Sequence, residues 1–211
     1  MSTSTRNYHH GDLRAALLSA AVESLEAGEP FSLRAIARRA GVSPTAPYRH
    51  FADREALDSA VAVAGFRDLQ ADLEAALAVL ADPAVPEDVI AALGVSYVGF
   101  ALRRPAVFRL MFGNECDEED SERVLASEQL HGMLSQEIER LFPGASNSNL
   151  SIALWSMAHG LAFLHLDGKL RPQTRDDVAV RVKSAVGAIF ALNANTAVAS
   201  PDPVTPPGER A

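Results

Sequence analysis

The sequence predicts an all-α protein, and three observations support that prediction. Apolar residues recur at helical spacing through most of the 211 residues. No stretch alternates apolar and polar residues with the Val, Ile and Thr enrichment that is typical of strands. Gly and Pro stand between the periodic segments, where helices commonly end. We therefore expect a succession of helices and no sheet.

The first two helices are defined by their end residues. The first begins near Asp12 and ends at Gly28, because glycine is well suited to the left-handed position that follows a helix. Ser32 can cap a second helix whose apolar positions fall at i, i+3, i+4 and i+7, and this helix stops at Gly41. Three residues then separate it from a third, short helix. That arrangement is a tight helix-turn-helix.

The third helix must be short, and the fourth is long. Ser43 is a natural N-cap for the third helix, and Pro44 suits its first position. Pro47 is tolerated only near the first turn, because a proline deeper in a helix costs about 3 kcal/mol. It falls at the edge of that turn if Ser43 is the cap and inside it if Thr45 is the cap. Asp53 can cap the fourth helix, which runs to the break at residues 82–83. This helix would join the helix-turn-helix to the rest of the protein.

The remaining segments predict a second helical bundle. Its helices are expected at residues 87–104, 105–112, 120–142, 148–170 and 176–193. The last residues contain four prolines and few apolar anchors, so we expect a disordered tail. The predicted domains are a flexible arm (1–11), a helix-turn-helix domain (12–57), a dimerisation and effector domain (58–195) and the tail (196–211).

Composition excludes several classes of protein. Hydrophobic residues make up 48% and charged residues 22% of the chain, which is ordinary for a globular protein and unlike a disordered one. The single cysteine, Cys116, cannot form an intrachain disulfide, and no Cys/His cluster has zinc-site spacing. No apolar run approaches the roughly 20 residues that span a bilayer, and the first residues do not resemble an export signal. We expect a cytoplasmic protein without metal or cofactor.

Charge is distributed unevenly along the chain. Residues 1–54 carry seven Arg and five acidic residues, whereas the remainder carries 12 basic and 22 acidic residues. The formal net charge of the whole chain is -8. A basic N-terminal part on an acidic body indicates a small module that binds a polyanion.

The strongest motif runs from Phe31 through the turn to Phe51. A helix-turn-helix places the start of its second helix in the major groove, where base edges can be distinguished. We expect Thr45 and Pro47 to face bases, through a hydroxyl and through a ring that can pack on a thymine methyl. Tyr48, His50 and Arg54 are residue types that reach phosphate oxygens. The alternative is an ordinary helical hairpin with core aromatics.

This segment resembles the DNA-binding pattern of the TetR family of bacterial transcriptional regulators. The resemblance covers about residues 10–57: a turn serine, a short recognition helix, Tyr-x-His-Phe and an acid-base-acid start to the fourth helix. It implies DNA contacts from Ser32, Arg34, Ser43, Thr45, Ala46, Pro47, Tyr48, His50 and Arg54. Many members have Gly in place of Ala46 and Lys in place of Arg54. These departures concern the operator sequence and not the role.

The N-terminal arm also resembles one subgroup of the family. Residues 8–13, Tyr-His-His-Gly-Asp-Leu, are similar to the lead-in of that subgroup. Adjacent histidines on an arm make a poor preformed metal site, so we favour an arm that lies near DNA. Arg6 can enter a minor groove, although a disordered terminus explains it equally well.

A second resemblance lies in the C-terminal bundle. Trp155, His159 and Gly160 resemble the Trp-x-x-x-His-Gly element of a TetR-family C-terminal class. Trp155 and His159 are four residues apart and share one helix face. The candidate residues of an effector pocket are Tyr97, Phe100, Phe108, Met111, Phe112, Met133, Trp155, His159 and Phe163. The alternative is a packed core, with His159 either in a pocket or at a dimer surface.

No enzyme motif is present in the sequence, since the nucleophile-elbow, phosphate-loop, zinc-protease and dinucleotide-binding patterns are all missing. The resemblance implies repression that is relieved by a ligand, with an activator as the alternative. From the residues themselves we expect a homodimer that binds double-stranded operator DNA and a largely apolar small-molecule effector. The last two long helices are expected to form the dimer through apolar positions that include Ile152, Leu161, Leu164, Val182, Val186 and Ile189. The fourth helix is expected to couple effector and DNA binding. A helical ligand-binding protein or an interaction scaffold without DNA binding is the alternative.

Overall fold

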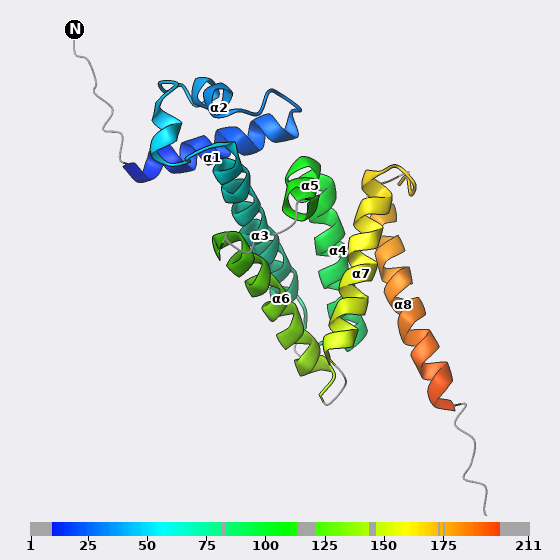
Figure 1. Cartoon of the computed structure of the whole chain (residues 1–211). Helices are drawn as coiled ribbons and strands as arrows, with labels where there is room; N and C mark the ends of the chain where they lie inside the picture. Colours follow the sequence, from blue (N-terminus) through cyan, green and yellow to red (C-terminus); the bar gives the residue numbers. More distant parts are fainter. Residues whose placement is uncertain are drawn as a thin grey trace, which may run out of the picture.

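The computed structural model describes residues 10–81, 83–113, 121–143, 147–172, 174 and 176–198, together with most of their side chains. Within these ranges the chain forms eight α-helices and one short 3-10 helix, and no strand (Figure 1). The predicted all-α class is confirmed. The predicted arm up to residue 9 and the tail from residue 199 lie outside the described residues.

The N-terminal helices form their own small core. Helix α1 (His10–Glu26) packs against α2 (Leu33–Arg39) around buried Leu17 and Ile36. The hydroxyl of Ser32 accepts a hydrogen bond from the Ala35 N–H at 3.2 Å, as its predicted capping role requires. Gly28 and Gly41 end the two helices with φ of +66° and +69°, in the left-handed region that glycine tolerates.

The third helix differs from the prediction. It is a 3-10 helix, η1, of only four residues (Ala46–Arg49), and no side chain caps it. The hydroxyl of Ser43 instead lies 3.3 Å from that of Thr45. Because Pro47 has no N–H, it cannot donate the α-helical hydrogen bond to the carbonyl of Ser43. The chain therefore closes tighter turns, among them the hydrogen bond from the His50 N–H to the Pro47 carbonyl.

Helix α3 (Arg54–Ala78) connects the two parts of the molecule (Figure 1). Asp53 caps it, as predicted, by accepting a hydrogen bond from the Ala56 N–H at 2.9 Å. Its 25 residues span about 37 Å at 1.5 Å per residue. The helix thus extends from the helix-turn-helix into the C-terminal bundle.

Five helices complete the C-terminal bundle. They are α4 (Pro86–Arg103), α5 (Pro105–Gly113), α6 (Ser121–Leu141), α7 (Asn147–Leu166) and α8 (Asp176–Val198). Helix α3 packs against α4, α5 and α6, while α4 also contacts α7 and α8. None of the helices that the structure describes combines the length and apolarity that a bilayer crossing needs.

Two helix ends differ from the predicted boundaries. Helix α7 ends at Leu166 instead of residue 170, because Gly168 adopts a φ of +68° and the N–H of Lys169 turns back to the Leu164 carbonyl. Helix α8 continues to Val198, three residues into the predicted tail.

Candidate functional site

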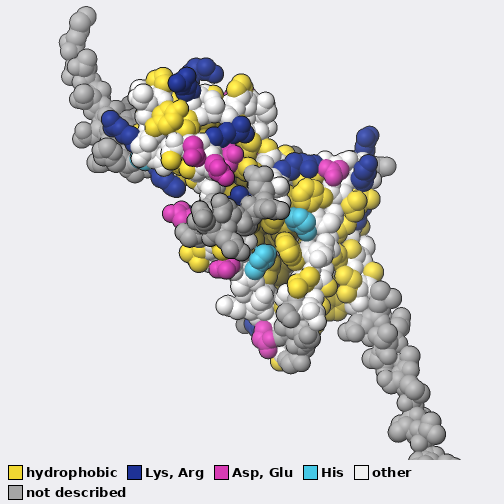
Figure 2. Space-filling model, in the orientation of Figure 1, with side chains coloured by type: hydrophobic (Ala, Val, Ile, Leu, Met, Phe, Trp, Pro, Cys, Tyr) yellow, Lys and Arg dark blue, Asp and Glu magenta, His cyan; other side chains and the backbone are white. Residues whose placement is uncertain are grey.

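The helix-turn-helix end of the molecule presents basic side chains. Figure 2 shows Lys and Arg side chains over the part formed by α1 and α2. Arg34 and Arg38 are both exposed and lie four residues apart, on one face of α2. Arg49 is exposed on η1. Sequence reasoning had not selected Arg38 or Arg49, although both lie within the motif and carry the right charge.

Most of the predicted DNA-contacting residues are accessible. The exposed members are Ser32, Arg34, Ser43, Thr45, Tyr48 and Arg54. Ala46 and His50 are half-buried. The Tyr48 side chain remains 50% exposed, so it is accessible to DNA.

Pro47 does not fit its predicted role. It is buried against the helix-turn-helix, so its ring is not available to a thymine methyl. The tight turns of η1 place the proline on the inner side, next to buried Phe51, whose N–H donates to the Pro47 carbonyl at 2.9 Å. Thr45 and Tyr48, by contrast, are among the exposed side chains of this segment.

Two arginines near this surface are held by the protein itself. Arg39 forms ion pairs with Glu23 and Glu29 at 3.2 and 2.6 Å. Arg54 lies over the Phe31 ring, 5.6 Å from its centroid, and 3.6 Å from an Asp58 oxygen. The Arg54 side chain is still 66% exposed, which leaves its guanidinium accessible to a phosphate.

The second candidate site is a cluster of aromatic rings between α4, α5 and α7. Phe112 lies 4.8 Å from His159 and 4.9 Å from Phe108, measured between ring centroids. Phe163 lies 4.9 Å from His159. Rings at these separations are in packing contact. The cluster is therefore largely filled by its own side chains.

A hydrogen-bonded triad links this cluster to Trp155. The indole N–H of Trp155 donates to the Tyr97 oxygen at 3.2 Å, and this oxygen lies 2.8 Å from Nδ1 of His159. The Tyr97 hydroxyl can then donate its proton to Nδ1, with His159 neutral. Burial lowers the pKa of His159 and raises that of Tyr97, which favours the neutral form of both groups.

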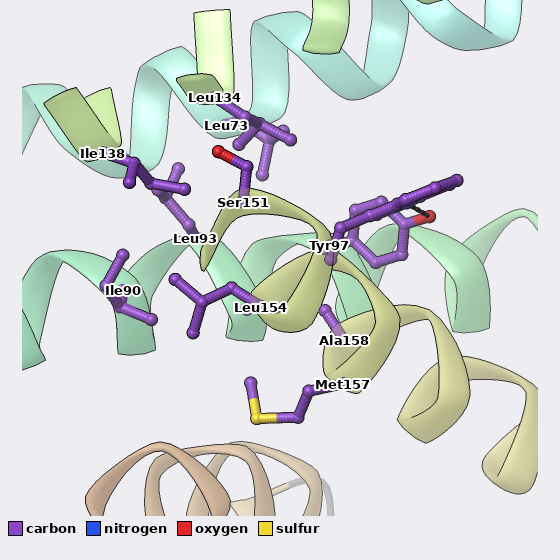
Figure 3. Close-up of a pocket in the computed structure, with 12 residues that line it drawn as sticks. Leu73, Ile90, Leu93, Tyr97, Leu134, Ile138, Ser151, Leu154, Met157 and Ala158 are labelled. Carbon is purple, nitrogen blue, oxygen red and sulfur yellow. Dashed lines mark hydrogen bonds between the residues drawn. The ribbon is translucent and has the colours of Figure 1, made fainter. Parts of the chain in front are cut away.

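A cavity lies beside the cluster. It has a volume of about 50 Å³ and is lined by side chains of α3, α4, α6 and α7 (Figure 3). Among the predicted pocket residues, only Tyr97 and Trp155 line it. The other seven do not: Phe100, Phe108, Met111, Phe112, Met133, His159 and Phe163. Phe100, Phe108 and Met111 are buried core residues, as the alternative interpretation expected.

Sequence reasoning missed the aliphatic walls of the cavity. On α7 the cavity is lined by the predicted Trp155, by Met157 and by Ser151, Leu154 and Ala158, which together with Trp155 are spaced at i, i+3, i+4 and i+7. Their spacing marks one face of a helix. It could have extended the pocket from Trp155 toward the start of α7 instead of toward His159.

Two family models match the chain. A model of the N-terminal domain, "Bacterial regulatory proteins, tetR family", covers residues 17–61. A model described as "Tetracyclin repressor-like, C-terminal domain" covers residues 90–189. The chain belongs to the TetR family. TetR-family regulators are non-enzymatic DNA-binding proteins, so this chain is a DNA-binding transcriptional regulator, as the sequence predicted.

Solved structures share the TetR-family fold. A protein of unknown function from Rhodococcus sp. RHA1 is 33% identical, with a TM-score of 0.73 over 86% of this chain and 96% of its own. A putative transcriptional regulator from Pseudomonas aeruginosa PAO1 is 16% identical, with a TM-score of 0.68 over 93% and 99% of the two chains. The TetR-family regulator PfmR from Thermus thermophilus is 17% identical, with a TM-score of 0.59 over 84% and 97%. No curated protein matches.

Proposed function

We propose that this TetR-family protein is a repressor that binds a palindromic operator in the cytoplasm as a homodimer and is released by a small-molecule effector. One observation carries the proposal. A single continuous helix, α3, connects the helix-turn-helix to the helical bundle that contains a cavity. Selection of bound sequences from random DNA tests it. The recovered site should contain two inverted half-sites about one helical turn apart.

The DNA contacts divide into two groups. Thr45 is exposed at the start of η1, so its hydroxyl is the candidate for a base edge. Tyr48, half-buried His50 and Arg54 are candidates for phosphate contacts that set the position on the duplex. Arg34, Arg38 and Arg49 add charge on the same segments. Pro47 acts indirectly in this arrangement, by fixing the turn that presents Thr45 and Tyr48.

The dimer surface is proposed on α7 and α8. Ile152 and Leu164 remain 58% and 43% exposed, and with Gly160 between them they follow one exposed stripe of α7. A Cβ added at Gly160 would meet nothing within 4 Å, so another backbone can approach there. Val180 and Ile189 extend the apolar surface on α8, at 61% and 37% exposure. Four helices from two protomers would bury these groups.

Two residues that the sequence assigned to the dimer belong elsewhere. Val182 and Val186 are both 0% exposed within a single protomer. Val182 packs toward α4, where a Cβ added at Gly94 would lie 2.9 Å from its Cγ1. Exposed Val180 takes the place of these two residues in the proposed interface.

Coupling between the bundle and the DNA-binding helices is proposed to use a second link besides α3. The carboxylate of Glu26, at the end of α1, accepts hydrogen bonds from the N–H groups of Ala106 and Val107 at 3.1 and 3.0 Å. It thereby caps the first turn of α5. Helix α5 carries Phe108 and Phe112, which pack on His159. A shift of the aromatic cluster would thus reach α1 directly.

The finer assignment to the subgroup with Trp-x-x-x-His-Gly is also part of the proposal. Support comes from the shared partner of its two aromatic residues, since Trp155 and His159 both contact the hydroxyl of Tyr97. This triad gives the motif a physical role, because it fixes the facing sides of α4 and α7.

A further inference from the structure

Two hollows of the C-terminal bundle lie on either side of one wall. The inner cavity of about 50 Å³ lies between α3, α4, α6 and α7, a second hollow of about 270 Å³ lies beside α6 and α7, and both are partly open. Both are lined by Leu134, Ser151 and Trp155. Because these three side chains line both, the two spaces are adjacent. Figure 2 shows hydrophobic and histidine side chains facing outward in this region.

The residues that line the two hollows are mostly apolar, and two polar groups among them have no hydrogen-bond partner in the described part of the chain. No Asp, Glu, Lys or Arg lines either hollow among the described residues. The Ser151 oxygen and Nε2 of His131 are buried, and neither has a hydrogen-bond partner in the described part of the chain. Figure 3 shows the Ser151 hydroxyl on the side of the cavity where Leu134 and Ile138 lie. Buried polar groups are usually satisfied, so these two point to a ligand or water.

The two groups border the same space. Ser151 and His131 both line the outer hollow, and the His131 ring lies 4.8 Å from the Trp155 ring in an edge-to-face arrangement. Burial lowers the pKa of His131, so the ring stays neutral at pH 7 and can offer its nitrogen as donor or acceptor. The Tyr97 hydroxyl, by contrast, already has His159 and Trp155 as partners.

We propose that the effector of this regulator is an uncharged, narrow, largely apolar molecule with one hydroxyl or carbonyl oxygen. Its oxygen is held between Ser151 and His131, and its hydrocarbon part extends past Leu134 into the inner cavity. This inference rests on the proposed effector release. A charged head group is excluded because it would lose its hydration without gaining a counter-charge. The small volume of the inner cavity favours a narrow hydrocarbon chain for the part of the molecule that enters it.

Trp155 gives a direct readout of binding, because it is the single tryptophan of the chain and lines both hollows. The probes are eight-carbon compounds that differ in the head group: 1-octanol, 2-octanone, octanoate and octylammonium. We expect saturable changes of Trp155 fluorescence with the two neutral probes. We expect octanoate and octylammonium to bind at least about tenfold more weakly, as desolvation of a charge predicts.

Two matched variants locate the oxygen. Ser151→Ala should weaken binding of 1-octanol by about tenfold, the effect of one lost hydrogen bond in a buried site. Ser156→Ala changes an exposed serine of the same helix and should leave the affinity unchanged. Thermal unfolding of each variant is the control that the fold is retained. Leu134→Phe should narrow the space between the outer hollow and the inner cavity and weaken the binding of both neutral probes.

The outcomes separate this inference from the proposed function. Three results would overturn the assigned ligand class. They are equal affinity for octanoate and 1-octanol, no saturable fluorescence change with either neutral probe, and equal effects of Ser151→Ala and Ser156→Ala on the affinity for 1-octanol. Operator binding is measured in the same samples by fluorescence anisotropy of labelled DNA. Neutral probes that bind but leave operator affinity unchanged would refute release by this site while the ligand assignment stands. If no neutral probe binds but the protein still binds operator DNA, the assigned ligand class is refuted while the proposed operator binding stands.

Discussion

The hydroxyls of Thr45 and Tyr48 are exposed and can contact DNA, whereas Pro47 is buried and cannot. Thr45→Ala should cost about 1–3 kcal/mol of operator binding and relax the preference at one base pair, because a base-edge contact is lost. Tyr48→Phe should weaken all sequences alike, since a phosphate contact carries no sequence information. Competition binding with single-base operator variants measures both effects.

Pro47→Ala is the contrasting variant for this prediction. It changes a buried residue of η1, so it should alter stability and overall affinity but not the preferred bases. Selectivity that survives Thr45→Ala and changes with Pro47→Ala would reverse the assignment of the base-reading residue.

Three histidines of the bundle make stability depend on pH. Burial lowers the pKa of His131, His159 and His165 below the usual value of 6.5. The unfolded chain therefore binds protons that the folded chain does not bind, and the free energy of unfolding falls as pH drops below about 6.5. Urea unfolding at several pH values between 7.5 and 5.5 should show the decrease. His131→Gln should reduce the slope, and an unchanged slope would remove His131 from this explanation.

At the scale of helices, the sequence predicted what local chemistry determines. Asp53 and Ser32 cap their helices as expected, because N-caps depend on residues three positions away. The short 3-10 helix η1 was not predicted, since the helix-breaking effect of Pro47 competes with a family pattern that implies an α-helix. The cavity beside the aromatic cluster was not predicted for a different reason. Periodicity identifies the face that a helix buries, whereas a cavity depends on how side chains from four helices fill the space between them.

The contact between α1 and α5 predicts a variant that uncouples the two sites. Glu26→Ala removes the acceptor for two N–H groups of α5, and loss of such a cap costs about 0.5–2 kcal/mol. Operator binding and ligand binding should each persist, but the ligand should change operator affinity less. Operator titrations with and without ligand measure this coupling energy.

Glu29→Ala provides the control for Glu26→Ala. Glu29 lies three residues further along and pairs with Arg39 instead of with α5, so its loss should leave the coupling unchanged. Equal coupling in the wild type and in Glu26→Ala would leave α3 as the sole proposed link.

Across the whole molecule, the negative net charge opposes DNA binding, whereas the spacing of two DNA-binding surfaces in a dimer would favour it. The chain carries a formal net charge of -8, so the attraction to DNA must come from the local arginines of α2, η1 and the start of α3. One such surface gives few contacts. Two surfaces held at the spacing of successive major grooves, about 34 Å, double the contacts and read an inverted repeat. Dimerisation is therefore expected to decide operator affinity as much as any single DNA contact does.

Leu164→Glu tests that expectation. Leu164 is 43% exposed on the stripe of α7 that is proposed to face a second protomer, and a buried carboxylate without a partner would disfavour the interface. The variant should sediment as a monomer at micromolar concentration and lose at least about tenfold in operator affinity, while its binding to a single half-site changes little. Leu125→Glu changes a leucine of α6 that is 53% exposed away from this stripe, and it should remain dimeric. A wild-type protein that sediments as a monomer and binds one half-site as tightly as the full operator would show that α7 and α8 do not form the functional interface.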